Sequence, residues 1–331
     1  MNAVGIIVNP IAGKDIRRLV TAASHTSDSA KIGIVRRAVA AAAEAGAERI
    51  LLADDPHHLA HRAVDGLDAP VFVIDEPLSG SRFDTVAAAT RMWKEQVGAL
   101  VVLGGDGTCR DVASGWPDAP MIAVSTGTNN VYPSSIDATS AGTAAAFVAI
   151  GAIAAADVSR RSKRVTTRIM TDDDVIDDLA LVDLALIDTT FVGSRAVMDA
   201  QTVRTVIASV ATPMSTGLSS IAGRVHPIGR FEPGGVMVTL GPGGRAVRVP
   251  LSPGTFTTVS VTSVTPLVEG QRVSVHGPGV LAFDGERDRR IGANVTVTAS
   301  VDTSGPFLID VERTLHLAAD AHLFEGNHHG N

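Results

Sequence analysis

The residues best suited to chemistry form a short glycine-rich segment, Gly104-Gly-Asp-Gly-Thr108, directly after the apolar run at residues 99–103. Glycine lets an anion approach the backbone closely, and it can adopt the positive φ that turns successive amides inward. A helix starting here would add unpaired amides and a positive dipole end, which favour phosphate. Asp106 would repel phosphate unless it binds Mg²⁺ or accepts a proton from an attacking hydroxyl. In the alternative interpretation, the segment is a tight turn in which Asp106 caps a helix.

The segment matches neither of the two common phosphate-binding motifs. A P-loop needs Gly-x4-Gly-Lys followed by Ser or Thr, and a dinucleotide fingerprint needs a glycine where Arg110 stands. Elsewhere, Lys14 is either a cation for a donor phosphate or a solvated loop lysine. Asn129 and Asn130 either hydrogen-bond a sugar or base, or are turn residues. Cys109 follows the glycine segment and is assigned no chemistry.

Histidines provide a separate candidate for metal binding. His57 and His61 are four residues apart, and Asp54 precedes them. Two histidines on one helix face can bind a metal ion. The sequence has no Glu where a His-Glu-x-x-His motif requires it and offers no evident third ligand. We therefore interpret these histidines as a solvated helix face.

Alternating strands and helices must position the glycine-rich segment. Apolar runs predict strands at residues 4–8, 49–53, 71–74, 99–103 and 121–124. Helices are expected at residues 31–45, with Asp28 and Ser29 as candidate caps, and at residues 83–96. This alternation is typical of a mainly parallel sheet covered on both faces. Ligands of such sheets bind at the carboxyl ends of the strands, where the glycine-rich segment lies.

Beyond about Arg164 the pattern changes to alternating runs rich in Val and Thr, separated by Gly/Pro turns. This pattern predicts an antiparallel β-sandwich-like domain. We expect an α/β domain at residues 1–137 and a β-sandwich domain at 138–305. A helix at residues 138–156 would join them, and a second helix at 194–210 would be inserted in the β domain. Residues 306–331 are expected to return to the first domain.

Composition narrows the class of partner. The 331 residues are 45% hydrophobic and 19% charged, which is typical of a globular protein. The apolar run at residues 144–156 is shorter than the roughly 20 residues that span a bilayer, and residues 1–20 resemble no secretory signal. A single cysteine excludes an intrachain disulfide and fits a cytoplasmic protein. A net charge of −7 argues against nucleic acid or an anionic membrane as partner, leaving a small molecule or another protein.

Five segments, taken in order, resemble the motifs of the superfamily that contains NAD kinases, diacylglycerol kinases and sphingosine kinases. They are Asn9-Pro-Ile-Ala-Gly-Lys14, Gly104–Thr108, Ser125–Asn130, Thr212–Gly223 and Phe283–Glu286. The pattern covers nearly all of the chain. It is most similar to the ATP-NAD kinase-like branch, also called the acetoin-catabolism X protein branch.

This resemblance implies a kinase whose active site lies in a cleft between the α/β and β-sandwich domains. It implies ATP or another phosphate donor, Mg²⁺, and a hydroxyl acceptor such as NAD. Asp106 and Asp284 would be catalytic, and Asp106 and Glu286 would bind the metal. Carried over position by position, the ligand-binding residues would be Asn9, Lys14, Gly104, Gly105, Gly107, Thr108, Thr126, Gly127, Thr128, Asn129, Asn130, Asp183, Thr212, Ser215, Ser219 and Glu286. Homo-oligomers are common in the superfamily, so a homo-oligomer is expected by analogy.

The chain departs from the NAD kinase pattern at the acceptor. In those kinases an Asn-Glu or Asn-Asp pair binds the dinucleotide, whereas this chain has Val182-Asp183 at the matching place. Leu218 stands where the NAD kinase motif has a tyrosine. Valine has no side-chain hydrogen-bonding group. Glu286 in place of glutamine resembles the lipid kinases. Three interpretations follow: a soluble kinase acting on NAD or a similar small polyol, a diacylglycerol-type lipid kinase, or a non-catalytic nucleotide-binding regulator. The acidic charge and the lack of an amphipathic docking helix argue against the lipid kinase.

Overall fold

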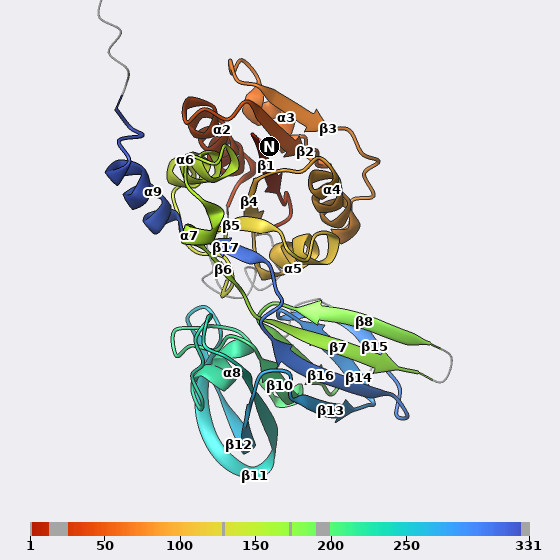
Figure 1. Ribbon diagram of the computed structural model, residues 1–331. Helices are drawn as coiled ribbons and strands as arrows, with labels where there is room; N and C mark the ends of the chain where they lie inside the picture. Colours follow the sequence, from red (N-terminus) through yellow and green to blue (C-terminus); the bar gives the residue numbers. More distant parts are fainter. Residues whose placement is uncertain (1, 13–25, 128–129, 172–173, 190–198, 326–331) are drawn as a thin grey trace, which may run out of the picture.

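Figure 1 shows the computed structural model of the chain, which describes residues 2–12, 26–127, 130–171, 174–189 and 199–325. Two domains meet at a narrow waist. The upper domain in this view contains the N-terminal strands, most of the helices and the last helix of the chain, and the lower domain consists almost entirely of strands. Of the expected ligand-binding residues, Lys14, Thr128 and Asn129 lie outside the described residues.

The first domain is built on a seven-stranded sheet with the order β3-β2-β1-β4-β5-β17-β6. These strands are β1 (Ala3–Val8), β2 (Arg49–Ala53), β3 (Val71–Ile74), β4 (Ala99–Gly104), β5 (Pro120–Ser125), β6 (Ser159–Arg161) and β17 (Phe307–Ile309). Neighbouring strands are parallel except for β6, which pairs antiparallel with β17. The carboxyl ends of β1, β2, β4 and β5 therefore lie along one edge, where ligands of parallel sheets bind.

Helices cover both faces of this sheet because its central strands are apolar on both sides. Along β4, Val101 packs in one hydrophobic core and Val102 in the other, as the period of two in a strand requires. One core is closed by α2 (Asp28–Glu44), α3 (Leu59–Val64), α6 (Ala138–Ala149) and α9 (Val311–Asp320), and the other by α4 (Arg82–Lys94) and α5 (Asp106–Gly115). The described residues contain no helix long and apolar enough to cross a membrane.

Serine side chains define where two of these helices begin. Ser27 Oγ accepts a hydrogen bond from the Ala30 amide at 3.1 Å before α2, and Ser81 Oγ accepts one from the Phe83 amide at 3.2 Å before α4. An N-cap hydroxyl satisfies an amide that has no intrahelical partner. The expected cap at Asp28 or Ser29 is therefore wrong, because both residues lie within α2.

The second domain consists of two antiparallel sheets that share a hydrophobic core. Their orders are β12-β11-β10-β9-β14-β15 and β13-β16-β7-β8. The strands are β7 (Arg164–Met170), β8 (Val175–Ala180), β9 (Asp183–Ile187), β10 (Val203–Ala208), β11 (Gly235–Ser252), β12 (Thr255–Leu267), β13 (Arg272–His276), β14 (Gly279–Phe283), β15 (Glu286–Ile291) and β16 (Thr296–Asp302). Along β9, Leu184 and Leu186 pack in the core shared by the sheets, whereas Ala185 and Ile187 pack in a second core with the short helix α8 (Ser219–Gly223).

The expected helix at residues 194–210 is wrong over most of its described part, in which only Ala200–Thr202 form one short 3-10 helix. Residues 203–208 form β10, in which Val206 and Ala208 pack in one core and Ile207 in the other. A run of β-branched residues favours this extended conformation. Residues 190–198 lie outside the described part of the chain.

The α/β domain also extends beyond the expected boundary at residue 137. Helix α6 packs closely on α2: a Cβ on Gly142 would lie 2.2 Å from the Ala38 carbonyl oxygen. The segment that follows continues through the short helix α7 (Ala155–Val158) into β6, at the edge of the same sheet. Near the end of the chain, β17 pairs in parallel with β5, and α9 packs against α6.

Candidate active site

The glycine-rich segment forms the turn between β4 and α5, at the carboxyl edge of the parallel sheet. Gly105 is the N-cap of α5, so the first amides of that helix have no intrahelical partner. None of Gly104, Gly105 and Gly107 has a positive φ, so the left-handed conformation suggested by the sequence is not used. Glycine is needed at position 104 for lack of space instead, because a Cβ there would lie 2.5 Å from the Thr108 side chain.

Asn9, at the carboxyl end of β1, is bound to this turn. Its Nδ2 donates to Thr108 Oγ1 at 2.9 Å, and its Oδ1 accepts from the amides of Ile11 and Ala12 at 3.0 and 3.2 Å. Thr108 is buried, with 3% of its surface exposed. These contacts indicate that Asn9 and Thr108 shape the loops around the site, whereas unpaired amides at a helix N-terminus are groups that can bind an anion.

The loop after β5 lies beside the same turn. Asn130 Nδ2 donates to Ser125 Oγ at 2.8 Å, and a Cβ on Gly105 would lie 3.0 Å from Asn130 Oδ1. The Gly127 carbonyl accepts from Ser125 Oγ at 2.8 Å. Thr126 is 3% exposed, and its Oγ1 has no hydrogen-bond partner among the described residues. An unpaired buried hydroxyl is costly, so Thr126 is a candidate contact for a ligand.

Asp106 lies at the first position of α5, half-buried beside the β domain. Its Oδ1 accepts from the amides of Val131 and Tyr132 at 3.0 and 2.8 Å, and its Oδ2 accepts from Val131 at 3.2 Å. Burial, reinforced by the charge of Asp284, raises the pKa of Asp106 to about 7. A carboxylate has about four acceptor positions, so these three contacts leave one on Oδ2.

Two further carboxylates come from the β domain. Asp284, in the turn between β14 and β15, accepts from the amides of Leu181 and Val182 at 3.0 and 2.7 Å. Asp183 accepts backbone hydrogen bonds from Ser219 and Gly285. Burial raises the pKa of Asp284 to about 6. Burial and the charges of Asp284 and Asp106 raise the pKa of Asp183 well above its usual value.

Asp183 is also incompletely satisfied. It is 3% exposed, and its Oδ1 has no hydrogen-bond partner within the described ranges. A buried carboxylate oxygen without a partner is strongly unfavourable. The unpaired Oδ1 of Asp183 is therefore a candidate contact for a ligand.

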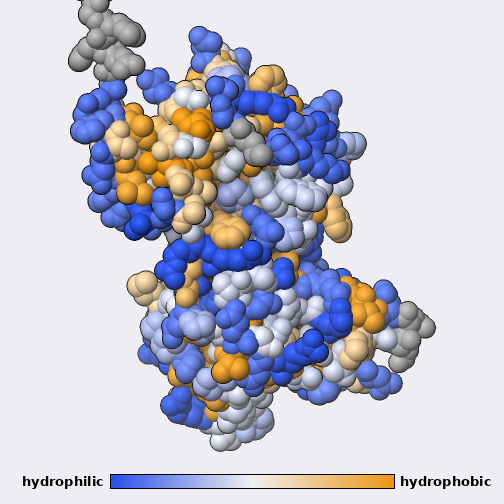
Figure 2. All heavy atoms as spheres, in the orientation of Figure 1, coloured by the Kyte–Doolittle hydropathy of each residue, from blue (hydrophilic) through white to orange (hydrophobic). Residues whose placement is uncertain are grey.

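Glu286 brings the β domain onto the glycine-rich turn. A Cβ on Gly107 would lie 3.5 Å from Glu286 Oε1, so this carboxylate lies against the backbone expected to hold phosphate. Hydrophilic residues gather where the two domains meet (Figure 2). A carboxylate beside an anion-binding turn is unfavourable unless a cation lies between the two negative groups.

The segment that contains Thr212, Ser215 and Ser219 contacts Asp183 through the backbone of Ser219. Ser215 Oγ contacts Thr212 Oγ1 at 3.1 Å, and the Ser215 amide donates to the Thr212 carbonyl at 3.0 Å. Ser219 reaches the site through its backbone, since its amide donates to Asp183. Between them, the Met214 side chain is 89% exposed.

Arg110 joins the two domains and was not predicted as a site residue. It is 5% exposed and donates to the Leu179 carbonyl at 2.7 Å and to the carboxylates of Asp178 and Asp288 at 2.9 and 3.0 Å. Its guanidinium lies 4.4 Å from the centre of the Phe283 ring. The sequence shows Arg110 two residues after the glycine-rich segment, but all four partners lie far along the chain.

Arg230 makes a second contact between the domains that the sequence did not indicate. Its Nη2 donates to the Val131 carbonyl at 2.7 Å, and its guanidinium lies 5.5 Å from the centre of the Tyr132 ring. Val131 and Tyr132 are the residues whose amides bind Asp106. The positive charge of Arg230 favours the ionised form of Asp106 and partly opposes the rise in its pKa.

Comparisons with known proteins agree with this architecture. The model of the ATP-NAD kinase N-terminal domain family matches residues 4–152, and that of the acetoin catabolism protein X C-terminal domain family matches residues 164–304. Acetoin catabolism protein X of Cupriavidus necator is 36% identical over 334 residues, which cover 97% of this chain and 93% of the relative.

One solved structure shows the same fold. A yeast NADH kinase, solved with NADH, superposes with a TM-score of 0.57 at 14% identity, covering 100% of this chain and 89% of that chain. A putative diacylglycerol kinase from Bacillus anthracis reaches a TM-score of 0.44 at 11% identity, over 93% of this chain and 97% of that chain.

The fold is thus that of the two-domain NAD kinases, and the expected α/β domain followed by a β-sandwich domain is confirmed. Within this class, the chain belongs to the family of acetoin catabolism protein X. The resemblance inferred from the sequence motifs is confirmed as well.

Proposed function

We propose that this chain is a kinase that transfers a phosphoryl group from ATP to a hydroxyl of NAD or of a similar small polyol. The observation that carries the proposal is the meeting of Asp106, from the α5 N-terminus, with Asp284 and Glu286, from the turn after β14. Asp284 is close enough to raise the pKa of Asp106, and Glu286 lies against Gly107. The α/β domain would bind the donor, and the β domain would complete the site.

The site fits a magnesium nucleotide. Unpaired amides of the α5 N-terminus suit a phosphate, and carboxylate oxygens are ligands that Mg²⁺ prefers. We assign the metal to Glu286, because two backbone amides already occupy Asp106 Oδ1. Bound there, Mg²⁺ would neutralise charge on the donor phosphates. The unpaired Oδ1 of Asp183 supports a ligand or cation at the same junction.

Asp106 is then the base. The acceptor hydroxyl oxygen forms a bond to the terminal phosphorus of ATP, the bond from that phosphorus to the leaving oxygen of ADP breaks, and the hydroxyl proton passes to Asp106 Oδ2. This oxygen keeps one acceptor position after its contact with Val131. Asp284 has a supporting role, since it fixes the amides of Leu181 and Val182 and so sets the wall of the site facing Asp106.

The acceptor subsite differs from a site for a whole dinucleotide. Val182 is 1% exposed, its amide is bound to Asp284, and its carbonyl accepts from the Ser209 amide at 2.8 Å. Leu218 is 3% exposed. Neither residue offers a polar group to an acceptor, so Asp183 and Thr126 are the candidate contacts for its hydroxyls. This arrangement favours a small polyol, and NAD would bind with fewer hydrogen bonds than in NAD kinases.

A labelled-phosphate transfer assay tests the proposal. ATP labelled at the terminal phosphate is incubated with Mg²⁺ and, separately, with NAD, NADH, acetoin, glycerol and diacylglycerol in vesicles. We expect transfer to at least one soluble hydroxyl compound, and transfer at least about 10²-fold slower by Asp106→Asn. Transfer to diacylglycerol alone would replace the proposal by the lipid kinase, and no transfer to any acceptor would contradict a kinase for these substrates.

A non-catalytic nucleotide-binding regulator is the second candidate. The three contacts of Asp106 with the amides of Val131 and Tyr132 are compatible with it, because they fix the segment 131–132 whether or not Asp106 accepts a proton. In that case ATP would raise the melting temperature of the protein without any phosphoryl transfer. A cytoplasmic location, a homo-oligomeric state and the lack of nucleic-acid and membrane partners stay predictions.

A further inference from the structure

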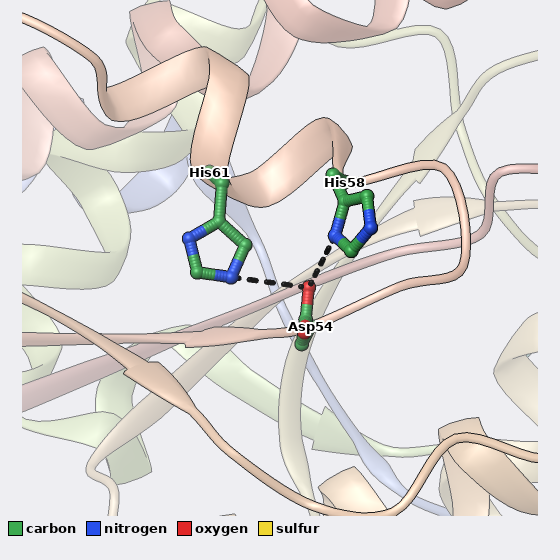
Figure 3. A group of neighbouring side chains, drawn as sticks. All are labelled: Asp54, His58 and His61. Atoms are coloured by element: carbon green, nitrogen blue, oxygen red, sulfur yellow. Dashed lines mark ion pairs between the residues drawn. The ribbon is translucent and has the colours of Figure 1, made fainter.

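Two imidazoles and one carboxylate converge after β2, outside the proposed active site (Figure 3). Asp54 Oδ1 lies 3.4 Å from His61 Nε2 and 3.9 Å from His58 Nδ1. The three candidate ligand atoms all lie within 4.8 Å of one another. The expectation that His57 and His61 share one solvated helix face is wrong, because His57 precedes the helix and its Nδ1 contacts Asp28 Oδ2 at 3.0 Å.

The local fold explains why His58 replaces His57. Helix α3 begins at Leu59, so His57 precedes it, whereas His58 is its N-cap with a φ of 53°. His61 follows three residues later, and residues three apart share a helix face. Asp54 directly follows the last residue of β2, and its side chain reaches this face of α3 from the end of the strand. The sequence showed no third ligand because the turn that brings Asp54 back toward the helix was not evident.

We propose that Asp54, His58 and His61 bind a divalent transition metal ion of the zinc class. Imidazole nitrogen and carboxylate oxygen bind zinc at about 2.0–2.2 Å, so two ligands of a tetrahedral site lie about 3.3 Å apart. The Asp54–His61 distance already meets this requirement. Three protein ligands leave one position for water, as in open zinc sites.

Small side-chain rotations complete the site. The side chains of His58 and His61 are 67% and 54% exposed, so rotation meets little packing. Asp54, at 15% exposure, is the anchored ligand, and its Oδ1 also accepts from the Asp55 amide at 2.8 Å.

The backbone around the ligands is held firmly. Asp55 is 2% exposed, and its carboxylate accepts from the amides of His57 and Ala60 at 2.9 and 3.1 Å. The His58 amide donates to the Asp55 carbonyl at 2.9 Å. A turn fixed in this way reduces the entropy lost when the ligands close around an ion.

This site is chemically and spatially separate from the Mg²⁺ site of the proposed kinase. In the sheet, β2 is separated from β4 by β1, so their ends lie about 10 Å apart at the usual strand spacing. Imidazole ligands favour zinc, cobalt, nickel and copper, whereas Mg²⁺ prefers oxygen ligands. The metal proposal does not depend on the kinase proposal.

Titration of the metal-free protein with Zn²⁺ by calorimetry, and with Co²⁺ by visible absorption, tests this site. His328 and His329 offer imidazoles of their own, so both are replaced by alanine in every protein compared. We expect one ion per chain and Co²⁺ bands in the visible range. His58→Ala, His61→Ala and Asp54→Asn should each weaken binding at least tenfold, because even indirect partners of metal ligands contribute about 10–100-fold.

His57→Ala is the matched control, since it removes a neighbouring imidazole that faces Asp28. Its affinity should equal that of the parent protein, and circular dichroism should show that all four variants are folded. The proposal is overturned if the parent shows no saturable binding, if the three ligand variants bind as tightly as the parent, or if His57→Ala weakens binding as much as His61→Ala.

Discussion

The Arg110 contact between the domains allows a quantitative prediction. Arg110→Met keeps most of the side-chain stem but removes the guanidinium, and with it the hydrogen bond to the Leu179 carbonyl and two carboxylate contacts. Breaking a buried ion pair costs about 3–5 kcal/mol. Asp178 and Asp288 are 14% and 31% exposed and regain some hydration, so we expect the lower end, about 3 kcal/mol.

The chain provides a matched control. Arg168 contacts Asp177 through Nε and Nη2 at 2.8 and 2.9 Å, but the two side chains are 59% and 64% exposed. Exposed pairs contribute little because water solvates both charges. We expect Arg168→Met to melt at the same temperature as the wild type.

Differential scanning calorimetry measures both variants. A loss of about 3 kcal/mol lowers the melting temperature by roughly 6–12 °C, taking about 2–4 °C per kcal/mol for a domain of this size. Arg110 ties α5 to the β domain, so any separate transitions of the two domains should also move further apart in Arg110→Met. Equal melting temperatures for the Arg110 and Arg168 variants would refute the conclusion that the buried ion pairs of Arg110 stabilise the contact between the two domains.

Three further predictions follow from burial and packing. The pKa of Asp183 is raised in the folded state, so the folded protein binds more protons above pH 4 than the unfolded one and loses stability as pH rises. Asp183→Asn should therefore become more stable relative to wild type as the pH of urea unfolding rises from 4 to 8. A difference in the free energy of unfolding that does not change with pH would contradict this. Gly104→Ala places a Cβ 2.5 Å from the Thr108 side chain and should lower the free energy of unfolding by about 1–3 kcal/mol. In Gly107→Ala the Cβ would lie 3.5 Å from its nearest neighbour, Glu286 Oε1, so the melting temperature should stay the same. Calorimetry should show that ATP binding to Gly107→Ala is at least tenfold weaker than to wild type. Tyr132→Phe loses a buried hydroxyl contact of 2.8 Å and should lower the free energy of unfolding by about 1 kcal/mol, with no change if that contact is absent in solution.

Much of the α/β domain could be predicted from the sequence, because its strands are short apolar runs and the ends of its helices carry local signals. The glycine-rich segment was placed correctly between β4 and α5 for the same reason. The strand at residues 203–208 was mistaken for a helix, because both of its faces are buried and its sequence therefore shows no alternation of apolar and polar residues. The placement of α6 depends on its contact with α2, more than a hundred residues earlier, which no local pattern encodes.

The candidate site shows the same division. Asp106, Asp284 and Glu286 were identified from short motifs, and the structure brings them to one junction. Their hydrogen-bond partners and the burial that raises the pKa of the two aspartates are tertiary properties. The guanidinium contacts of Arg110 and Arg230 were missed because arginine is common on surfaces, and only the arrangement of the two domains buries Arg110 and half-buries Arg230.

The most direct test of the account is the rate of phosphoryl transfer by Asp106→Asn, compared with wild type, on whichever acceptor the wild type uses. Asparagine keeps the oxygen that accepts from the Tyr132 amide, so the fold and ATP affinity should be preserved. A positioned base contributes about 10²–10⁴ in rate. We predict a loss of at least 10² in kcat with ATP binding within about threefold of wild type. Turnover near the wild-type value in the folded, ATP-binding variant would contradict the assignment of Asp106 as the base.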